Sequence, residues 1–220
     1  MVQKLNIHLY DFDEDLLTAA KESGELQIRI YSVDNRFVVL GRGSKPEVEL
    51  NLENCLNEEV QIYQRRGGGC SVLLDPGNVI VSVATPAPGF GENPRYFDAI
   101  SRWLIEGLTS LGFEGVVRRG ISDLCIGDRK IGGSCIYRTK GLLYYTTTLL
   151  VHPDVQAMER FLKHPPREPK YRANREHSDF VIALDQVQTE LITSDLIESL
   201  QNTLNSEDLT HSIQDALNPH

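Results

Sequence analysis

The chain has 220 residues, of which 40% are hydrophobic and 24% are charged, and its formal net charge is -9. This length fits one large globular domain or two small ones. The acidic balance argues against a protein that coats nucleic acid, whose affinity depends on neutralising phosphates, but it leaves room for a local basic site that binds a small anion. No stretch approaches the roughly 20 apolar residues of a membrane span, so we expect neither nucleic acid nor a membrane as a partner.

Four cysteines bear on metal binding and on the cellular compartment: Cys55, Cys70, Cys125 and Cys135. They form no C-x-x-C pair and have no histidine at zinc spacing, so no metal site is expected. The first residues turn acidic before any apolar run long enough for a secretion signal, and they lack the arginines of a mitochondrial transit peptide. We therefore expect a cytoplasmic protein with reduced thiols.

The first half of the chain predicts one helix followed by short strands. Residues 13–23 have a helical pattern that Gly24 ends. Residues 26–33 and 37–43 are rich in β-branched residues, and the polar pair between them, Asp34 and Asn35, predicts a hairpin. The remaining elements expected here are a helical stretch at residues 46–58 and strands at residues 60–65, 70–75 and 78–85, the last two joined by a turn at residues 75–78.

The second half predicts one long helix and then mainly strands. The helix begins at Asn93, has Pro94 at its first helical position and ends before Gly112, with Trp103 bordering its apolar stripe. Gly127 and the following residue predict a tight hairpin turn. The other elements expected are strands at residues 115–120, 123–127, 129–137 and 142–151 and helices at 155–163 and 193–204. Residues 163–180, rich in proline and charge, are expected to form a loop or a partly ordered crossing.

The order of these elements indicates the fold class. Strands dominate the middle of the chain, and single helices are interspersed without a regular β-α-β alternation. This order predicts an α+β fold in which one antiparallel or mixed sheet is flanked by helices, in a single domain over residues 1–220.

Three consecutive glycines, Gly67, Gly68 and Gly69, follow Arg65 and Arg66 and precede an apolar strand. Backbone amides in such a loop can approach an anion, since no Cβ is in the way, and guanidinium groups beside them form a corner for a carboxylate or phosphate. The loop leads into a strand and carries no G-K-[ST], so a P-loop is excluded and a dinucleotide-binding fingerprint does not fit. A bulge or tight turn is the alternative interpretation of the glycines.

A second segment, "SDLCIGDRKIGGSC", has the same character. It places Asp123 seven residues before Lys130 across the turn at Gly127, so a hairpin would bring the two side chains together. Lys130 is followed by Gly132 and Gly133, so an ammonium group again lies next to bare backbone. A solvated surface lysine is the alternative interpretation of Lys130.

Together the two segments resemble one family. "RRGGGCSVLLDPGN" resembles the Arg-rich, Gly-Gly-Gly motif of lipoate-protein ligases, and "SDLCIGDRKIGGSC" resembles that family's Asn-Asp-Leu followed by Lys-x-x-Gly-Ser-Ala. "NRFVVLGRGSKPEVELNLENC" and "LLYYTTTLLV" are similar to two further motifs, in the family's order. The resemblance implies the α+β catalytic fold that lipoate-protein ligases share with biotin ligases and octanoyltransferases.

The resemblance also implies an activity. Such a ligase makes lipoyl-AMP from lipoate and Mg²⁺-ATP and passes the acyl group to a lysine of a lipoyl domain, with octanoate as the other candidate acid. Lys130 would hold the acyl carboxylate and stabilise the oxyanion, and Asp123 would orient the attacking amine. Arg65 and the amides of Gly68 and Gly69 would cradle the phosphate or carboxylate. Apolar Val72 and Val81, or their neighbours, would line the acyl tunnel. The other matched binding positions are Cys70, Ser71, Asn78, Gly133, Ser134 and Thr148.

The sequence departs from the family pattern at two kinds of position. Thr146 and Thr147 stand where the family has histidine and glycine before Thr-Leu-Leu, and Leu74 replaces the histidine before Asp75. The residues after Asp185 are too few for the C-terminal accessory domain of larger ligases. We expect that domain to be absent or to lie on a separate chain.

Two other functions remain open on the sequence. An octanoyl or lipoyl acyltransferase would need a nucleophilic cysteine, and neither position typical of those enzymes is cysteine here. Cys70 and Cys135 lie inside the binding motifs instead, where a neighbouring Arg65 or Lys130 would lower the pKa of the thiol. The third possibility is a non-catalytic relative that binds the lipoyl group but has lost the chemistry.

Overall fold

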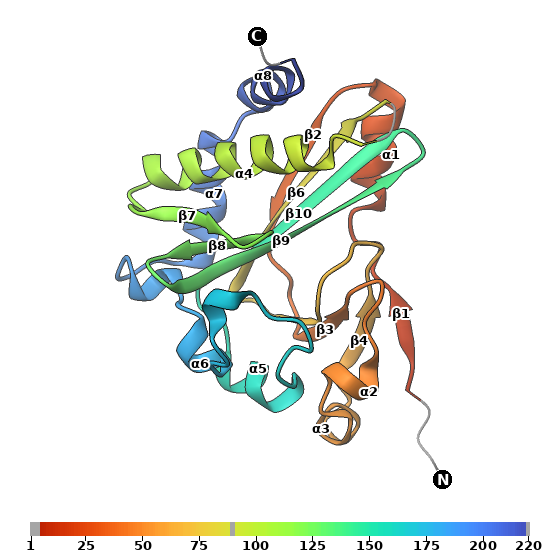
Figure 1. Ribbon diagram of the computed structural model, residues 1–220, viewed down its shortest axis with the longest axis vertical. Helices are drawn as coiled ribbons and strands as arrows, with labels where there is room; N and C mark the ends of the chain where they lie inside the picture. Colours follow the sequence, from red (N-terminus) through yellow and green to blue (C-terminus); the bar gives the residue numbers. More distant parts are fainter. Residues whose placement is uncertain (1–4, 89–90, 219–220) are drawn as a thin grey trace.

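Two β-sheets form the body of the molecule in a computed structural model that describes residues 5–88 and 91–218 (Figure 1). Within these residues, the larger sheet is antiparallel, and its order is β2 (Gln27–Tyr31), β6 (Asn78–Pro86), β10 (Leu142–Leu150), β9 (Arg129–Thr139), β8 (Asp123–Ile126) and β7 (Val116–Arg119). The smaller sheet is mixed, in the order β1 (Ile7–Leu9), β4 (Gln61–Gln64), β3 (Phe37–Leu40) and β5 (Val72–Leu74).

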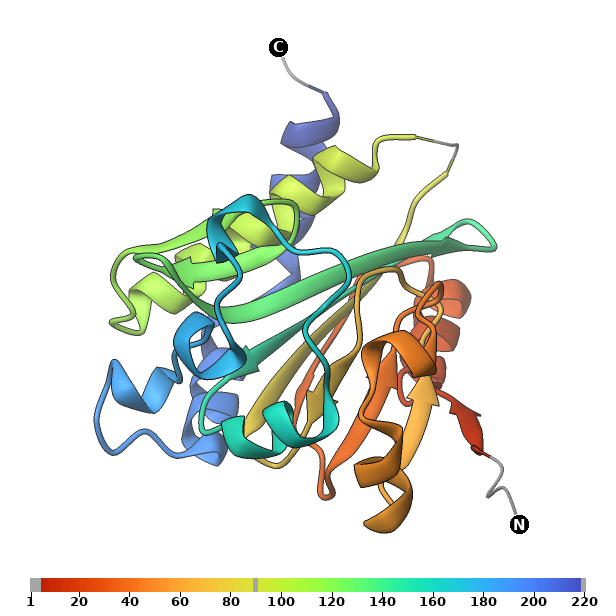
Figure 2. The same ribbon diagram turned by 60° about the horizontal axis from the view of Figure 1, so that its bottom comes forward.

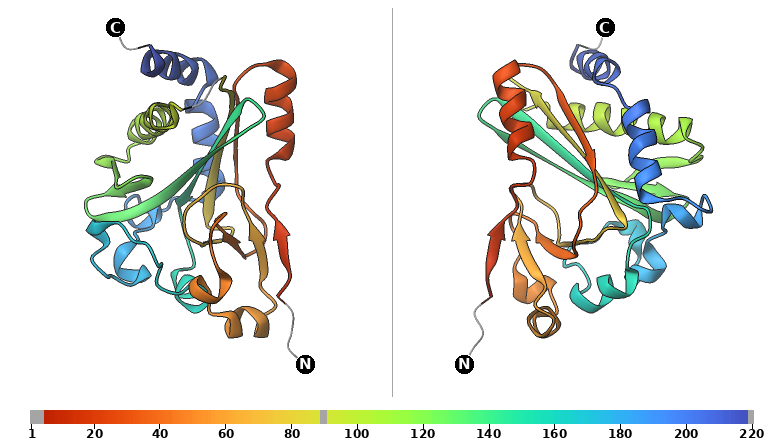
Figure 3. Two further views of the ribbon diagram at one scale, coloured as in Figure 1. Left: turned by 45° about the vertical axis from the view of Figure 1, so that its right-hand side comes forward. Right: turned by 180° about the vertical axis from the view of Figure 1, so that it is seen from behind.

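Helices flank these sheets, as the predicted α+β class requires. Figure 3 shows α4, α7 and α8 on one side of the larger sheet and α1 on the other. The helices are α1 (Glu14–Ser23), α2 (Pro46–Glu49), α3 (Leu52–Asn57), α4 (Asn93–Ser110), α5 (Val155–Phe161), the 3-10 helix η1 (Lys170–Arg172), α6 (His177–Phe180), the 3-10 helix η2 (Leu184–Gln186), α7 (Thr193–Thr203) and α8 (Ser206–Leu217). Among the described residues, no helix is both long and apolar enough to cross a membrane.

The two faces of the larger sheet have different partners because strand side chains alternate. Val81 and its neighbours two residues away on β6 pack with α4, α7 and α8 in the main hydrophobic core. Ile80 and Ala84 lie on the opposite face, where Ile80 packs against the smaller sheet and Ala84 against α1. The second face is therefore the one that the glycine-rich loop between β4 and β5 can reach.

Most predicted elements of the second half are confirmed. Helix α4 has Pro94 in its first turn, Trp103 is 4% exposed in the core, and Gly112 follows the helix with φ +92°. Gly127, with φ +61°, lies in the turn of the β8–β9 hairpin. The conformation of these residues is determined by their nearest neighbours in the chain, which is why local sequence predicts it.

The predicted hairpin of residues 26–43 is wrong. Strand β2 pairs with β6 in the larger sheet, whereas β3 pairs with β4 and β5 in the smaller one. Residues 32–36 therefore cross from one sheet to the other. A run of β-branched residues predicts a strand but not its partner, since cross-strand contacts with distant residues decide the pairing.

Two further elements, strand β1 and helix α8, were not predicted. Residues 163–180, expected as a loop or a partly ordered crossing, contain η1 and α6, so the partly ordered alternative is the one observed. Arg172 of this segment is only 4% exposed and stacks on the ring of Phe180 at 4.7 Å. The segment is thus packed against the body of the molecule despite its prolines and charges.

The turn between β5 and β6 gives a stability prediction. A Cβ added at Gly77 would lie 1.9 Å from the carbonyl oxygen of His152, whose amide donates to the Gly77 carbonyl at 2.8 Å. We expect Gly77→Ala to lower the free energy of unfolding by about 1–3 kcal/mol, because two backbone segments must separate. Urea denaturation measures this. Gly43→Ala is the control, since nothing lies within 4 Å of its Cβ, and equal urea midpoints for the two variants would contradict the prediction.

Candidate active site

The glycine-rich loop lies directly against β9. A Cβ at Gly67 would come within 2.7 Å of Cys135 Sγ, so the close approach of the loop to the sheet requires glycine there. Gly69 has φ +99°, a conformation that favours glycine. Gly68 has open space around its Cα, with nothing within 4 Å of an added Cβ. The loop is therefore both a tight turn and a surface where bare backbone is accessible.

Arg65 fixes the shape of this loop. Its Nη2 donates to the carbonyl oxygens of Gly68 at 2.9 Å and Cys70 at 2.8 Å, and its Nη1 donates to that of Val39 at 3.3 Å. The contact between Arg65 and a ligand stays a prediction, and the structure adds a loop-shaping role for this side chain. Among the described residues, no carboxylate forms an ion pair with Arg65, so its positive charge remains at the loop.

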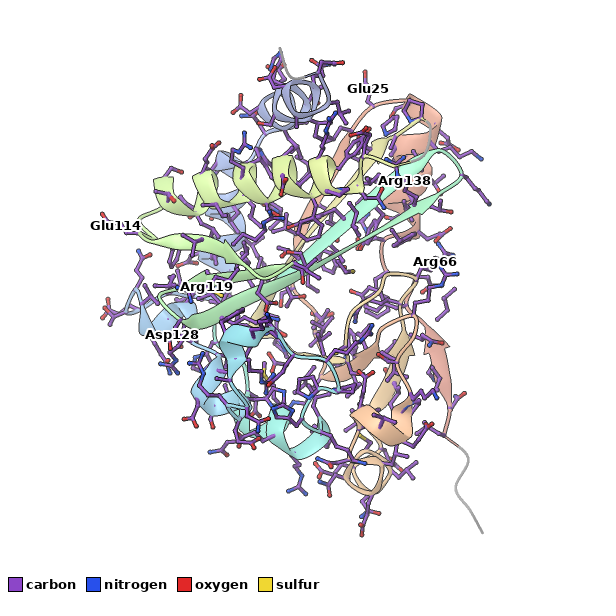
Figure 4. All side chains as sticks on the ribbon, in the orientation of Figure 1. Glu25, Arg66, Glu114, Arg119, Asp128 and Arg138 are labelled. Carbon is purple, nitrogen blue, oxygen red and sulfur yellow. The ribbon has the colours of Figure 1, made fainter. Side chains whose placement is uncertain are left out.

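Arg66 points away from the loop interior. Its guanidinium pairs with Glu14 at 2.7 Å, and hydrogen bonds with Tyr137 and then Glu14 raise the pKa of Arg66. In Figure 4, Arg66 is labelled near the glycine-rich loop. Arg119 and Asp128 are labelled at the opposite end of the larger sheet, near β7 and the β8–β9 turn. The two arginines of the motif thus have different partners.

Lys130 and Asp123 meet as predicted. Lys130 Nζ lies 2.6 Å from Asp123 Oδ1, and Asp123 is 8% exposed. A β-bulge brings this about: Gly132 pairs with Leu124, the next pair is Lys130 with Cys125, and Ile131 is left unpaired. Without that extra residue, alternation would direct Lys130 to the opposite face of the sheet.

Gly133 makes room for the ammonium group. A Cβ at Gly133 would lie 2.8 Å from Lys130 Nζ and 3.7 Å from Asp123 Oδ1. The Lys130 side chain therefore lies across bare backbone of its own strand. Thr148 pairs with Gly133 from β10 and lies on the same face. The structure thus brings Lys130, Asp123, Gly133 and Thr148 together.

Tyr171 of η1 also belongs to this group, although sequence reasoning missed it. Its hydroxyl donates to Asp123 Oδ2 at 2.7 Å and lies 3.3 Å from Cys125 Sγ. Burial, followed by the contacts with Cys125 and Asp123, raises the pKa of Tyr171, so the phenol stays protonated. A tyrosine inside a charged, proline-rich stretch is no recognisable motif, so the sequence contains no signal for this contact.

Cys135 is not activated as expected. Burial raises the pKa of Cys135, and this effect exceeds the opposing influence of Arg65. The expectation of a lowered pKa is therefore wrong for Cys135, because losing water costs the thiolate more than the guanidinium returns. Cys70 lies on the loop, with its Sγ 3.5 Å from the carbonyl oxygen of Arg167.

The remaining residues that match the family motifs lie in three different places. Ser71 donates from its amide and its hydroxyl to Glu49 Oε2, at 2.6 and 2.7 Å, and Val72 packs between the two sheets. Asn78 is fully buried in the β5–β6 turn, where its Oδ1 accepts from the Asp75 amide at 3.0 Å. Ser134 lies on the helix side of β9, and its Oγ accepts from the Tyr145 hydroxyl at 2.8 Å.

Val81 also lies on the helix side, with the main core. Val81 therefore shares no surface with Val72, and of the residues expected near the tunnel it is the neighbour of Val81 that lies with Val72. Alternation along β6 decides the matter: the residue on the loop side is Ile80, which packs with Val72 in the cluster between the sheets.

A partly exposed strip runs along the sheet from Lys130. Thr146 and Thr148 are half-buried, whereas the other residues of β10 are buried, and their neighbours Cys135 and Gly133 on β9 are half-buried too. Figure 2 shows this face of the sheet framed by the β4–β5 loop and by residues 163–176. The strip is a surface on which an extended chain could lie, with Lys130 at one end.

A buried polar cluster closes the other end of the strip. Asp13 Oδ2 accepts hydrogen bonds from Ser82 at 2.7 Å, Tyr144 at 2.5 Å and Tyr31 at 3.1 Å, and Ser82 also donates to Thr146 at 3.2 Å. Burial and then the charge of Asp13 raise the pKa of Tyr144, so its phenol remains a donor. The described site therefore has an ammonium at one end, a hydrogen-bonded stop at the other, and the glycine-rich loop against Cys135 between them.

Known proteins share this fold. The chain superposes on one component of the bipartite lipoate-protein ligase system of Thermoplasma acidophilum with a TM-score of 0.70 and 21% identity, over 96% of this chain and 89% of that one. It superposes on a lipoate-protein ligase A bound with ATP with a TM-score of 0.71 and 18% identity, over 97% and 94% of the two chains. At these identities the likeness concerns the fold.

Sequence relatives give the same family. A lipoate-protein ligase of Streptococcus pyogenes is 32% identical over 127 residues, which are 57% of this chain and 36% of that protein. The lipoate-protein ligase A of Psychrobacter cryohalolentis is 27% identical over 137 residues, 62% and 39% of the two chains. The chain thus spans less than half the length of the curated relatives it matches.

One family model matches most of the chain. It is described as the lipoyl protein ligase A/B catalytic domain, and it matches residues 9–205, which include both motifs and most of the described elements. The chain belongs to the lipoyl protein ligase A/B catalytic-domain family.

Proposed function

We propose that the protein activates lipoate with ATP, giving lipoyl-AMP and pyrophosphate, and then transfers the lipoyl group to a lysine of an acceptor lipoyl domain with release of AMP. The observation that carries the proposal is Lys130, whose ammonium lies over Gly133 at the end of the partly exposed strip. Family membership and relatives named lipoate-protein ligases support it.

In the first step a carboxylate oxygen of lipoate attacks the α-phosphorus of Mg²⁺-ATP, and the bond to the leaving pyrophosphate breaks. Lys130 has three N–H donors, of which Asp123 takes one, so others remain for the carboxylate and the α-phosphate. The bare backbone of Gly68 and the positive charge of Arg65 favour an anion at the loop. These groups are preset, so little reorganisation opposes the charge that develops.

In the second step the acceptor amine attacks the acyl carbonyl carbon, and the bond to AMP breaks. Lys130 is placed to stabilise the oxyanion of the tetrahedral intermediate. The Asp123 carboxylate, paired with Lys130 and buried, can accept a hydrogen bond from the incoming amine and orient it. No cysteine takes part in this sequence of steps.

The acyl chain would lie along the strip between Lys130 and Thr146. Successive residues on one face of a strand are about 6.7 Å apart, so the strip from Gly133 past Cys135 to the polar cluster accommodates a chain of about eight carbons. This length suits lipoate and octanoate alike. The stop formed by Asp13, Ser82 and Tyr144 limits the length of the chain.

We also propose that residues 1–220 act as one catalytic unit. Helices α7 and α8 cover the larger sheet and α4 within the main core, so they complete this unit and form no second one among the described residues. One relative, the T. acidophilum system, is described as bipartite. A separate chain that supplies an accessory domain would match that system, and we place the reaction in the cytoplasm.

The direct test is an assay of both half-reactions. Protein, lipoate and Mg²⁺-ATP should release pyrophosphate, and addition of a lipoyl domain should give the lipoyl mass shift on that domain. Omission of ATP should abolish both signals. A relative that only binds the lipoyl group would give neither signal while still binding lipoate in calorimetry, and this result would refute the ligase function.

Loss of Lys130 should stop the reaction without preventing folding. Lys130→Ala removes the donor for the carboxylate and oxyanion, and removal of one such donor typically costs about 10² to 10³ in rate. Pyrophosphate release measures it. Lys21→Ala, on exposed α1, is the matched control. Near wild-type activity of Lys130→Ala with normal thermal unfolding would refute the catalytic assignment.

Cysteine variants separate the ligase from an acyltransferase. Cys135→Ser and Cys70→Ser should each retain most activity, because the acyl group travels as an anhydride with AMP and burial keeps the Cys135 thiol protonated. An acyltransferase would lose orders of magnitude on loss of its nucleophile. Mass spectrometry after mixing with octanoyl carrier protein, without ATP, is the second measurement. An octanoyl adduct on either cysteine would establish the acyltransferase instead.

A further inference from the structure

Asp123 is held from two sides by groups on different segments. Oδ1 lies 2.6 Å from Lys130 Nζ, on the same hairpin, and Oδ2 accepts from the hydroxyl of Tyr171 at 2.7 Å, from η1 about fifty residues further along the chain. With one partner on each oxygen, the carboxylate has one favoured orientation. The direction of the ammonium therefore depends on Tyr171 through Asp123.

Tyr171 is fixed in place before any substrate binds. Arg175 Nη2 donates to its carbonyl oxygen at 3.0 Å and to that of Asp128, in the β8–β9 turn, at 2.8 Å. The ring lies 5.4 Å from that of Phe180, and Arg119 lies over it at 5.7 Å. Residues 163–176 are thereby clamped to the end of the hairpin that carries Lys130.

Cys125 completes the arrangement. Its Sγ lies 3.3 Å from the Tyr171 hydroxyl, and burial raises the pKa of this thiol. Since the single phenolic proton goes to Asp123, the thiol donates to the hydroxyl oxygen. The chain of donors therefore runs from Cys125 through Tyr171 to Asp123, and every proton in it stays in place at neutral pH.

We propose that Tyr171 is a positioning residue for the reaction: by holding Oδ2 of Asp123 it confines Lys130 to Oδ1 and aims the remaining N–H groups at the substrate. This inference rests on the proposed ligase function. Without the phenol, Asp123 can rotate, draw the ammonium toward both oxygens, and shift it away from the carboxylate and phosphate. A displacement of about 1 Å in a reacting group can cost about a hundredfold in rate.

Tyr171→Phe tests this role because it removes only the hydroxyl and keeps the ring against Phe180 and Arg119. We expect kcat for pyrophosphate release from lipoate and ATP to fall about tenfold to a hundredfold. KM for ATP should change less than about twofold, since only the proposed contact from Lys130 is displaced and those of Arg65 and the glycine-rich loop are kept. Tyr63→Phe is the matched control: it removes a phenol that donates to Gln61 at 2.9 Å and should leave both constants unchanged.

A double substitution separates positioning from general stability. If Tyr171 acts through Asp123, Tyr171→Phe should slow Asp123→Asn by no more than about twofold, although it slows the wild type tenfold or more. The same factor in both backgrounds would mean a merely structural role and would overturn the inference. Equal kcat for Tyr171→Phe and wild type would overturn it as well.

The same experiment distinguishes this inference from the ligase function. Wild-type protein and Tyr63→Phe report on the function, and the ratio of Tyr171→Phe to wild type reports on positioning. If the wild-type protein releases no pyrophosphate, the ligase function is refuted, and the positioning role of Tyr171 in that reaction is refuted with it. An active wild type with an unaffected Tyr171→Phe would leave the ligase intact and refute only the role of Tyr171.

Discussion

One irregularity in the larger sheet determines the chemistry of the site. The β-bulge opposite Leu124 and Cys125 leaves Ile131 without a partner and turns Lys130 to the face that carries Asp123. In a regular ladder the two side chains would lie on opposite faces, with Lys130 among the core residues around α4. The bulge thus avoids a buried, unpaired ammonium, which would be costly, and gives a paired one beside the glycine-rich loop. Gly133 then gives the lysine side chain room to lie flat on its own strand.

Glycines also allow the loop between β4 and β5 to approach the larger sheet closely. Gly67 lets the loop approach Cys135, and Gly69 allows a left-handed turn, so a segment between two strands of the smaller sheet reaches the middle of the larger one. Glycine loses much conformational entropy on ordering. Arg65 offsets part of that cost by donating to the Gly68 and Cys70 carbonyls. The flexible residues lie beside the charged ones because the guanidinium holds the loop in the shape that the glycines allow.

Features determined by residues close together in the sequence were predicted correctly, whereas features determined by contacts between distant residues were missed. The turn at Gly127 and the limits of α4 follow from short-range pattern, and both are confirmed. The hairpin also predicted the meeting of Asp123 with Lys130, which is confirmed, but the β-bulge that brings both to one face was not predicted. The pairing of β2 and β3 was wrong because their partners come from elsewhere in the chain. Tyr171 was missed for the same reason, since only the folded path of residues 163–176 brings it to Asp123. The predicted lowering of the Cys135 pKa was wrong because this thiol is buried, and no local motif indicates burial.

Charge pairing differs among the cations on this face of the larger sheet. Arg66 is paired with Glu14 and Lys130 with Asp123, whereas Arg65 donates to carbonyl oxygens and keeps its charge. The buried carboxylate of Glu49 also lies at the loop, where it accepts from the Ser71 amide and hydroxyl. Tyr171 adds a neutral donor to Asp123, so part of that carboxylate's charge is satisfied without Lys130. In the proposed positioning role the ammonium is held by one oxygen of Asp123, which leaves its other N–H groups to an arriving carboxylate or phosphate.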